Sequence, residues 1–116
     1  MKSIVTIAFT MTLALSAGSA FADDCTRPPS PAIPSGAAAT QEDMIAAQSA
    51  VKKFLADSET FRNCLQAQEA LIPKEQLTAD LQKSFVERYN AAVDAEVATG
   101  NEFNEAIRAY KAARAQ

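Results

Sequence analysis

An unbroken amphipathic stretch from residue 41 to residue 72 constrains the fold more than any other feature of the sequence. Its stripe advances in steps of three and four residues, which places the stripe on one face of a helix. The members of the stripe are Met44, Ala47, Val51, Phe54, Ser58, Phe61, Leu65, Gln68 and Ile72. Thr40 and Asp43 match a capping box at the start, and Pro73 ends the run. The sequence therefore predicts a first helix over about 41–72.

A second stripe follows a turn that the sequence PKEQLT predicts at about 73–77. It consists of Phe85, Val86, Tyr89, Val93, Val97, Gly100, Phe103, Ile107 and Tyr110. The stripe crosses Gly100 without losing phase, and a mid-helix glycine costs only about 1 kcal/mol. One helix over about 78–114 is therefore favoured over a break at residues 99–101, and Gly100 is expected to let a neighbour approach closely.

Two long helices joined by a short turn predict an all-α protein, namely a long antiparallel two-helix hairpin over residues 40–116 with coiled-coil packing. No alternating strand pattern follows the N-terminal leader. A hairpin covers one stripe of each helix, so a chain this small needs a disulfide or a partner to complete its core.

Residues 1–22 have the features of a secretory signal peptide. Lys2 supplies the positive start, a short apolar run follows, and Ala20-Phe21-Ala22 provides an A-x-A cleavage signal. The apolar run is too short to span a membrane stably. We therefore expect cleavage after residue 22, no membrane insertion afterwards, and a periplasmic or extracellular location.

Residues 23–39 are predicted to form an extended, Pro-rich arm. Pro28, Pro31 and Pro34 recur every third residue, so they share one face of a polyproline II helix. Such a segment is stiff before it docks. Ile33 is the one aliphatic side chain in the middle of the arm that can anchor it to the helices.

The chain has two cysteines, Cys25 and Cys64, and export predicts that they form a disulfide. Free thiols and an intermolecular bridge are the alternatives. From Thr40 to Cys64 the helix is roughly 36 Å long, and from Cys25 to Thr40 the extended arm reaches roughly 46 Å. The arm is thus long enough to run back along the first helix, so the bridge ties it there.

The composition argues against several classes of function. The chain has no histidine, three glycines and a net charge of −3. It therefore lacks the usual general base and zinc ligand, a glycine-rich phosphate loop, and the basic surface that nucleic acid needs. Glu102 and Glu105 share a helical face with Arg108 and are interpreted as a solvated ion-pair ladder. We expect no enzyme activity, no cofactor, no metal and no nucleic-acid partner.

Two resemblances add to these predictions. The order of a cysteine, spaced prolines, ATQEDMIAAQSAVKKFL, FRNCL, RYNAAV and EFNEAIRAYK resembles a group of small uncharacterised exported α-hairpin proteins of Gram-negative bacteria. That resemblance implies a disulfide-tied hairpin and carries no activity. Asn90 and Asn104 fall in its "YN" and "FN" pairs and are expected to make local hydrogen bonds. LTADLQ, residues 77–82, is similar to the L-T-x-x-Q segment of periplasmic helical chaperones, with the glutamine one position late.

These observations predict a non-enzymatic exported protein that acts by protein–protein contact or self-association, with a second copy or another envelope protein as partner. The residues expected to make the contact are Val51, Phe54, Phe61, Tyr89, Phe103 and Tyr110, within an apolar arc that Ile45, Leu55, Leu81 and Val86 make broader than one partner helix needs. One alternative is a thiol redox sensor that uses Cys25 and Cys64. Another is a chaperone-like envelope stress protein.

Overall fold

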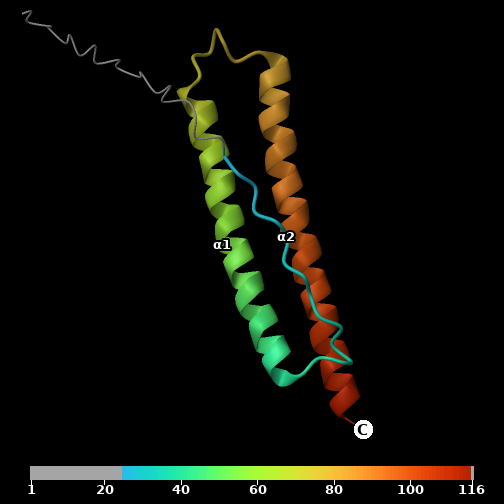
Figure 1. The fold of residues 1–116 in the computed structure, drawn as a ribbon. Coiled ribbons are helices and arrows are strands. Elements are labelled where there is room, and N and C mark those ends of the chain that lie inside the picture. The colour runs from blue at the N-terminus through green and yellow to red at the C-terminus, as the bar shows by residue number, and fades with distance from the viewer. Residues whose placement is uncertain (1–24, 116) are drawn as a thin grey trace, which may run out of the picture.

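A computed structural model describes residues 25–115 of the chain, which form a two-helix hairpin crossed by an extended arm (Figure 1). Helix α1 spans Gln41–Leu71 and helix α2 spans Ala79–Arg114, against predicted bounds of 41–72 and 78–114. Residues 25–115 contain no strand, and a disulfide joins Cys25 to Cys64. The fold class is all-α as predicted. The predicted signal peptide and its cleavage point lie outside the described residues.

Both helices begin at a threonine whose hydroxyl accepts a backbone hydrogen bond. At α1, the Thr40 N–H donates to Asp43 Oδ2 at 2.8 Å, and the Asp43 N–H donates to Thr40 Oγ1 at 3.1 Å, which completes the predicted capping box. At α2, Thr78 Oγ1 accepts from the Leu81 N–H at 3.2 Å. The two caps fix where each helix starts.

The cap of α1 is sensitive to acid. Hydrogen bonds from Thr40, first from its backbone and then from its side chain, hold the pKa of Asp43 below its usual value. A carboxyl group with a lowered pKa in the folded state stabilises that state above the pKa it has when unfolded. The contribution is lost as the pH falls through the lowered pKa.

The buried face of α1 follows the predicted stripe. Its buried residues are Met44, Ala47, Val51, Phe54, Ser58, Phe61 and Leu65, and the last two members of the stripe, Gln68 and Ile72, are half-buried. The prediction succeeds because large apolar residues occupy most positions, so hydrophobicity alone marks the face.

The buried face of α2 is rotated from the predicted one. Its fully buried residues are Phe85, Ala92, Thr99 and Ala106, at intervals of seven, with Tyr89, Glu96, Phe103 and Tyr110 half-buried between them. Val86 and Val97, predicted in the stripe, are 50% and 58% exposed. Centring the contact face of α2 on this stripe was wrong, because small residues form the contact face here and the bulkier valines lie beside it.

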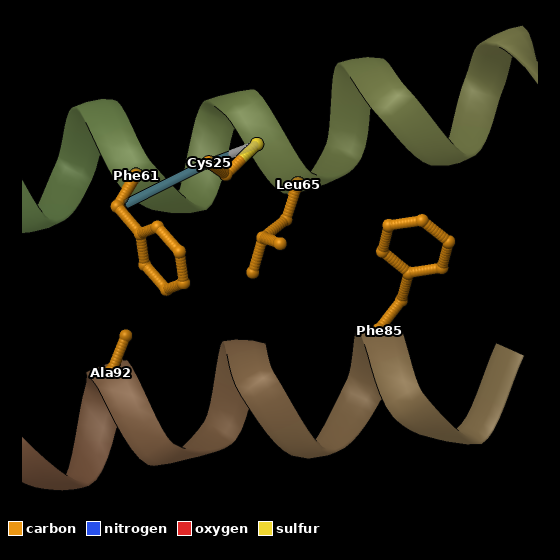
Figure 2. Close-up of a cluster of buried hydrophobic side chains, with 5 residues drawn as sticks. All are labelled: Cys25, Phe61, Leu65, Phe85 and Ala92. Atoms are coloured by element: carbon orange, nitrogen blue, oxygen red, sulfur yellow. The ribbon is translucent and has the colours of Figure 1, made fainter. Parts of the chain in front are cut away.

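The interior has two separate apolar clusters. The first, near the turn, contains Cys25, Phe61, Leu65, Phe85 and Ala92; Figure 2 shows the side chains of α1 and α2 pointing toward one another there. The second, near the other end of the hairpin, contains Ala39, Met44 and Ala106, with Ile33 and three residues of α2 packed on it. Each cluster therefore includes residues from the arm as well as from both helices.

The close backbone approach occurs at Gly36, in the arm, and not at Gly100. A Cβ on Gly36 would lie 1.8 Å from the backbone oxygen of Ala106 and 2.9 Å from the backbone nitrogen of Tyr110. A Cβ on Gly100 would meet nothing within 4 Å. Helix α2 continues through Gly100 as predicted, but the expectation that this glycine admits a neighbour within the chain was wrong.

The two glycines should therefore respond to alanine in opposite directions. Gly36→Ala should lower the free energy of unfolding by about 1–3 kcal/mol, because the added methyl group meets backbone that cannot rotate away. Gly100→Ala should raise it by up to about 1 kcal/mol, because alanine is the better helix former and the space is empty. Urea denaturation measures both changes.

Hydrogen exchange localises the effect of Gly36→Ala. The amides of Ala38 and Ala39 donate to the Ser35 carbonyl at 3.1 and 2.9 Å, so they should exchange faster when the arm lifts. Gly100→Ala should leave them unchanged. Equal stability and equal exchange in Gly36→Ala and the wild type would show that the arm does not lie against Ala106.

Candidate functional site

The beginning of the described arm is fixed to both helices. The Cys25–Cys64 disulfide joins it to α1, with the two Cα atoms 5.7 Å apart. Arg88 of α2 donates from its guanidinium group to the Cys25 carbonyl at 3.1 Å and lies over the Phe61 ring, 5.7 Å from the centroid. Cys25 itself is only 7% exposed. The Cys25 half of the bridge is thus packed in the core, and Cys64 is half-buried.

The end of the arm is fixed to α2. Gly36 lies against the backbone of Ala106, and Ile33 packs on the second apolar cluster as the predicted anchor. Arg114 donates to the Ala39 carbonyl at 2.8 Å while its guanidinium group lies 3.5 Å from the centroid of the Tyr110 ring. These contacts hold the arm where it turns back to enter α1.

Between these two ends the arm crosses from α1 to α2 (Figure 1). Pro28, Pro31 and Pro34 are half-buried, whereas Pro29 is exposed, so the prolines spaced by three do share the inner face. The length of the arm was predicted correctly, but a route along α1 alone was wrong. The physical reason is that Gly36 and Ala106 together remove the side-chain bulk that would keep the arm away from α2.

A polar contact joins the helices between the apolar residues. Arg62 Nε donates to Glu96 Oε1 at 2.9 Å, and Arg62 Nη1 donates to the Tyr89 hydroxyl at 3.2 Å. Hydrogen bonding to Tyr89, and then to Glu96, raises the pKa of Arg62 above its usual value. The Glu96 carboxylate is thereby engaged in a structural ion pair, which makes the register of the two helices specific.

The side of the hairpin opposite the arm is uncovered by the described chain. Val97 lies nine residues after Arg88 and nine before Ala106, which is two and a half helical turns from each arm contact. On α1, Leu55 lies nine residues before Cys64 and is likewise on the opposite side. We call this side the open face and define it by four exposed apolar side chains. They are Ile45, Leu55, Val86 and Val97, which are 39–58% exposed.

The six residues predicted to make contacts lie elsewhere. Val51, Phe54 and Phe61 are buried in the chain's own core, and Tyr89, Phe103 and Tyr110 are half-buried between the helices and the arm. Aromatic content, the signal behind that prediction, marks the core of this hairpin. Ile45, Leu55 and Val86 were predicted to flank the two stripes, and they are exposed on the open face. Val97 joins them because small residues of α2 occupy the core and leave it outside.

The described residues carry little that could support chemistry. Within residues 25–115 no three His, Cys, Asp or Glu side chains gather as a metal site would require. Glu102 and Glu105 are exposed and border a shallow hollow beside the end of the arm, together with Ile33 and Ala106. Paired carboxylates that do acid–base catalysis face each other across a cleft. These two share one exposed helical face instead.

Comparisons with protein-family models, with curated proteins and with solved structures gave no match for this chain. Among the described residues, neither helix is apolar over a stretch long enough to cross a membrane.

Removing the disulfide should free the start of the arm. The bridge closes a loop with a sequence separation of 39 residues, which corresponds to about 4 kcal/mol of unfolding free energy in the chain-entropy model. Chemical denaturation of the Cys25→Ser/Cys64→Ser variant measures this loss. Because Gly36 and Ala39 have their own contacts with α2, residues 25–32 should become protease-sensitive before residues 33–39.

The matched comparison is the wild-type chain with and without reductant. Limited proteolysis by an unspecific protease, followed by mass spectrometry, should show the same new cleavage sites in reduced wild type and in the double variant. Once mass spectrometry shows that both thiols are reduced, cleavage of the arm that matches the oxidised protein would contradict a disulfide-held arm. Because Cys25 is buried, the bridge should also resist reduction, with a potential below about −300 mV.

Proposed function

We propose that this chain is a non-enzymatic exported helical protein that acts by protein–protein contact or self-association. The observation that carries the proposal is the asymmetry of the hairpin. The arm covers one side, while the open face presents Ile45, Leu55, Val86 and Val97 to solvent. Apolar side chains grouped on one side of a small protein are typical of a surface that binds another protein.

Export is part of this proposal. A disulfide is favoured in the periplasm or outside the cell, and the N-terminal sequence has the features of a cleavable leader. The resemblance to small exported α-hairpin proteins of Gram-negative bacteria also supports a periplasmic location. In that compartment the bridge keeps the arm attached without any cofactor or energy source.

A structural role for the bridge fits its surroundings better than a sensor role. A redox-sensing cysteine is exposed and favours the thiolate. Cys25 is 7% exposed and packs with Phe61, Leu65 and Phe85, and the one charged group whose contact with it is described, Arg88, is bonded to its carbonyl. The arm thus serves to cover one face of the hairpin permanently, which directs any partner to the other face.

A photo-crosslinking amino acid at position 97 tests the proposal in living cells. Val97 is exposed at the centre of the open face, so a crosslinker there should yield covalent adducts of defined mass. A crosslinker at position 105, which is exposed beside the end of the arm, is the matched control and should yield few. An adduct of twice the chain's mass indicates self-association, and any other mass indicates a different partner.

The same experiment can reject the proposal. If neither position yields an adduct in the envelope, and the purified protein neither self-associates nor suppresses the aggregation of a model unfolded protein, then contact with proteins is not its function. The last assay also covers the chaperone-like alternative.

A further inference from the structure

Helix α2 carries a second stripe beside its buried face. Residues spaced by alternating steps of four and three form it, and none is charged: Val86, Asn90, Val93, Val97, Gly100, Asn104 and Ile107. Lys83 and Lys111 occupy the next positions of the same spacing and bound the stripe at each end. This is the spacing with which one helix packs lengthwise against another. Helix α1 packs mainly on the neighbouring face, centred on Ala92, Thr99 and Ala106, and reaches the stripe only at Ile107, which also packs on the second apolar cluster.

The stripe is largely unoccupied by the described chain. Val86 and Val97 are 50% and 58% exposed, and Asn90 and Asn104 are exposed too. The local hydrogen bonds expected for the two asparagines are absent, since neither amide makes a side-chain hydrogen bond within residues 25–115. Gly100 has open space where a Cβ would be. Because no side chain projects from the helix at this point, the side chains of an approaching helix have room there.

We propose that this stripe pairs with the same stripe of a second copy of the chain, in parallel and in register, around a two-fold axis that runs along the two α2 helices. The inference rests on the proposed function and deepens it by naming the partner and its orientation. Helix α1 and the arm lie on other sides of α2, so they leave room for a second α2 helix.

Charge favours a second copy as the occupant. A two-fold contact places a surface against itself, so any net charge on it would repel. The chain as a whole has a net charge of −3, yet residues 86, 90, 93, 97, 100, 104 and 107 contribute none. A self-complementary contact needs this neutrality, whereas a partner that is bound through charge would not.

The two asparagines favour the parallel arrangement. They are 14 residues apart, so they occupy equivalent positions in two successive repeats of seven. In a parallel, in-register pair, Asn90 faces Asn90 of the second copy and Asn104 faces its own counterpart, and each pair can hydrogen-bond. In an antiparallel pair, each layer brings an asparagine opposite a valine, Gly100 or Ile107, and the other copy's asparagine lies in a neighbouring layer, where the two amides are less well placed to pair. Asparagine at a core position of a parallel helix pair is known to select register in this way.

The size of the stripe indicates a weak and reversible dimer. Residues 86–107 make roughly 33 Å of helix, and a helix is about 10–12 Å wide. Each copy thus offers roughly 330–400 Å² of flat contact, compared with about 800 Å² per partner in a standard stable interface. We therefore expect the equilibrium between monomer and dimer to shift within the micromolar to millimolar range of protein concentration.

Sedimentation equilibrium of the purified, disulfide-bonded chain tests the association. The wild type should pass from monomer to dimer as its concentration rises. Val97→Asp should weaken the dimer at least tenfold, because it places two carboxylates against each other at the centre of the stripe. Leu71→Asp is the matched control, since Leu71 is 80% exposed at the end of α1 away from the stripe, and it should dimerise like the wild type.

Single cysteine substitutions test the orientation. Under mild oxidation Asn90→Cys and Asn104→Cys should each crosslink to themselves, and Ala98→Cys, exposed and turned away from the stripe, should not. In a mixture of Asn90→Cys and Asn104→Cys, no bond between positions 90 and 104 should form, because they lie roughly 21 Å apart along parallel helices. Mass spectrometry identifies each bond and verifies that Cys25 remains joined to Cys64.

Three outcomes would overturn the inference. They are a protein that stays monomeric to millimolar concentration, a dimer that Val97→Asp leaves intact, and a preferred bond between positions 90 and 104, which indicates antiparallel helices. A monomer whose position 97 still crosslinks to a different envelope protein would overturn the dimer and leave the proposed function standing. A monomer without any such adduct would remove both.

Discussion

The arm is the contact on which the rest of the structure depends, because it joins two apolar clusters that the helices alone leave apart. Cys25 completes the cluster near the turn, and Ile33 with Ala39 completes the other. One end is held by a covalent bond and the other by a close fit of Gly36 on Ala106. A hairpin of two helices has too little interior to be stable on its own. The arm supplies a third layer without a third helix.

The contact face of a helix could be predicted from the sequence only where large apolar residues form it. Helix α1 was predicted position by position because large apolar residues occupy its contact face. Helix α2 was predicted in extent but rotated in face, because Ala92, Thr99 and Ala106 contribute little hydrophobicity and still form the contact. Small residues occupy a helix contact where the two helix backbones lie close together. That separation depends on how the whole structure packs, so the hydrophobicity of the sequence does not reveal it.

The same limit applies to the candidate surface. Length arithmetic correctly predicted that the arm reaches Cys64, but only the packed structure shows that it crosses to α2. Gly36 in the arm, and not Gly100 in α2, is the glycine that allows a close approach between two backbones. Val97 was assigned to the same stripe as Phe103 and Tyr110, and its exposure places it on the open face instead. The corrections at Gly100 and Val97 both follow from the rotation of α2, and the route of the arm follows from the close fit of Gly36 on Ala106.

The middle of the hairpin is weakly stabilised, so the contacts of the arm at both ends matter more. Ser58 is 1% exposed and its hydroxyl has no hydrogen-bond partner among the described residues, and Thr99 is buried as well. An unpaired buried hydroxyl costs about 1–3 kcal/mol, so this stretch contributes less than the clusters on either side. Arg62 and Glu96 set the register, but a partly exposed ion pair adds little stability. The stabilising contacts are therefore concentrated at the two ends of the hairpin, where the arm is anchored. The side of α2 away from the arm makes few contacts within the described chain.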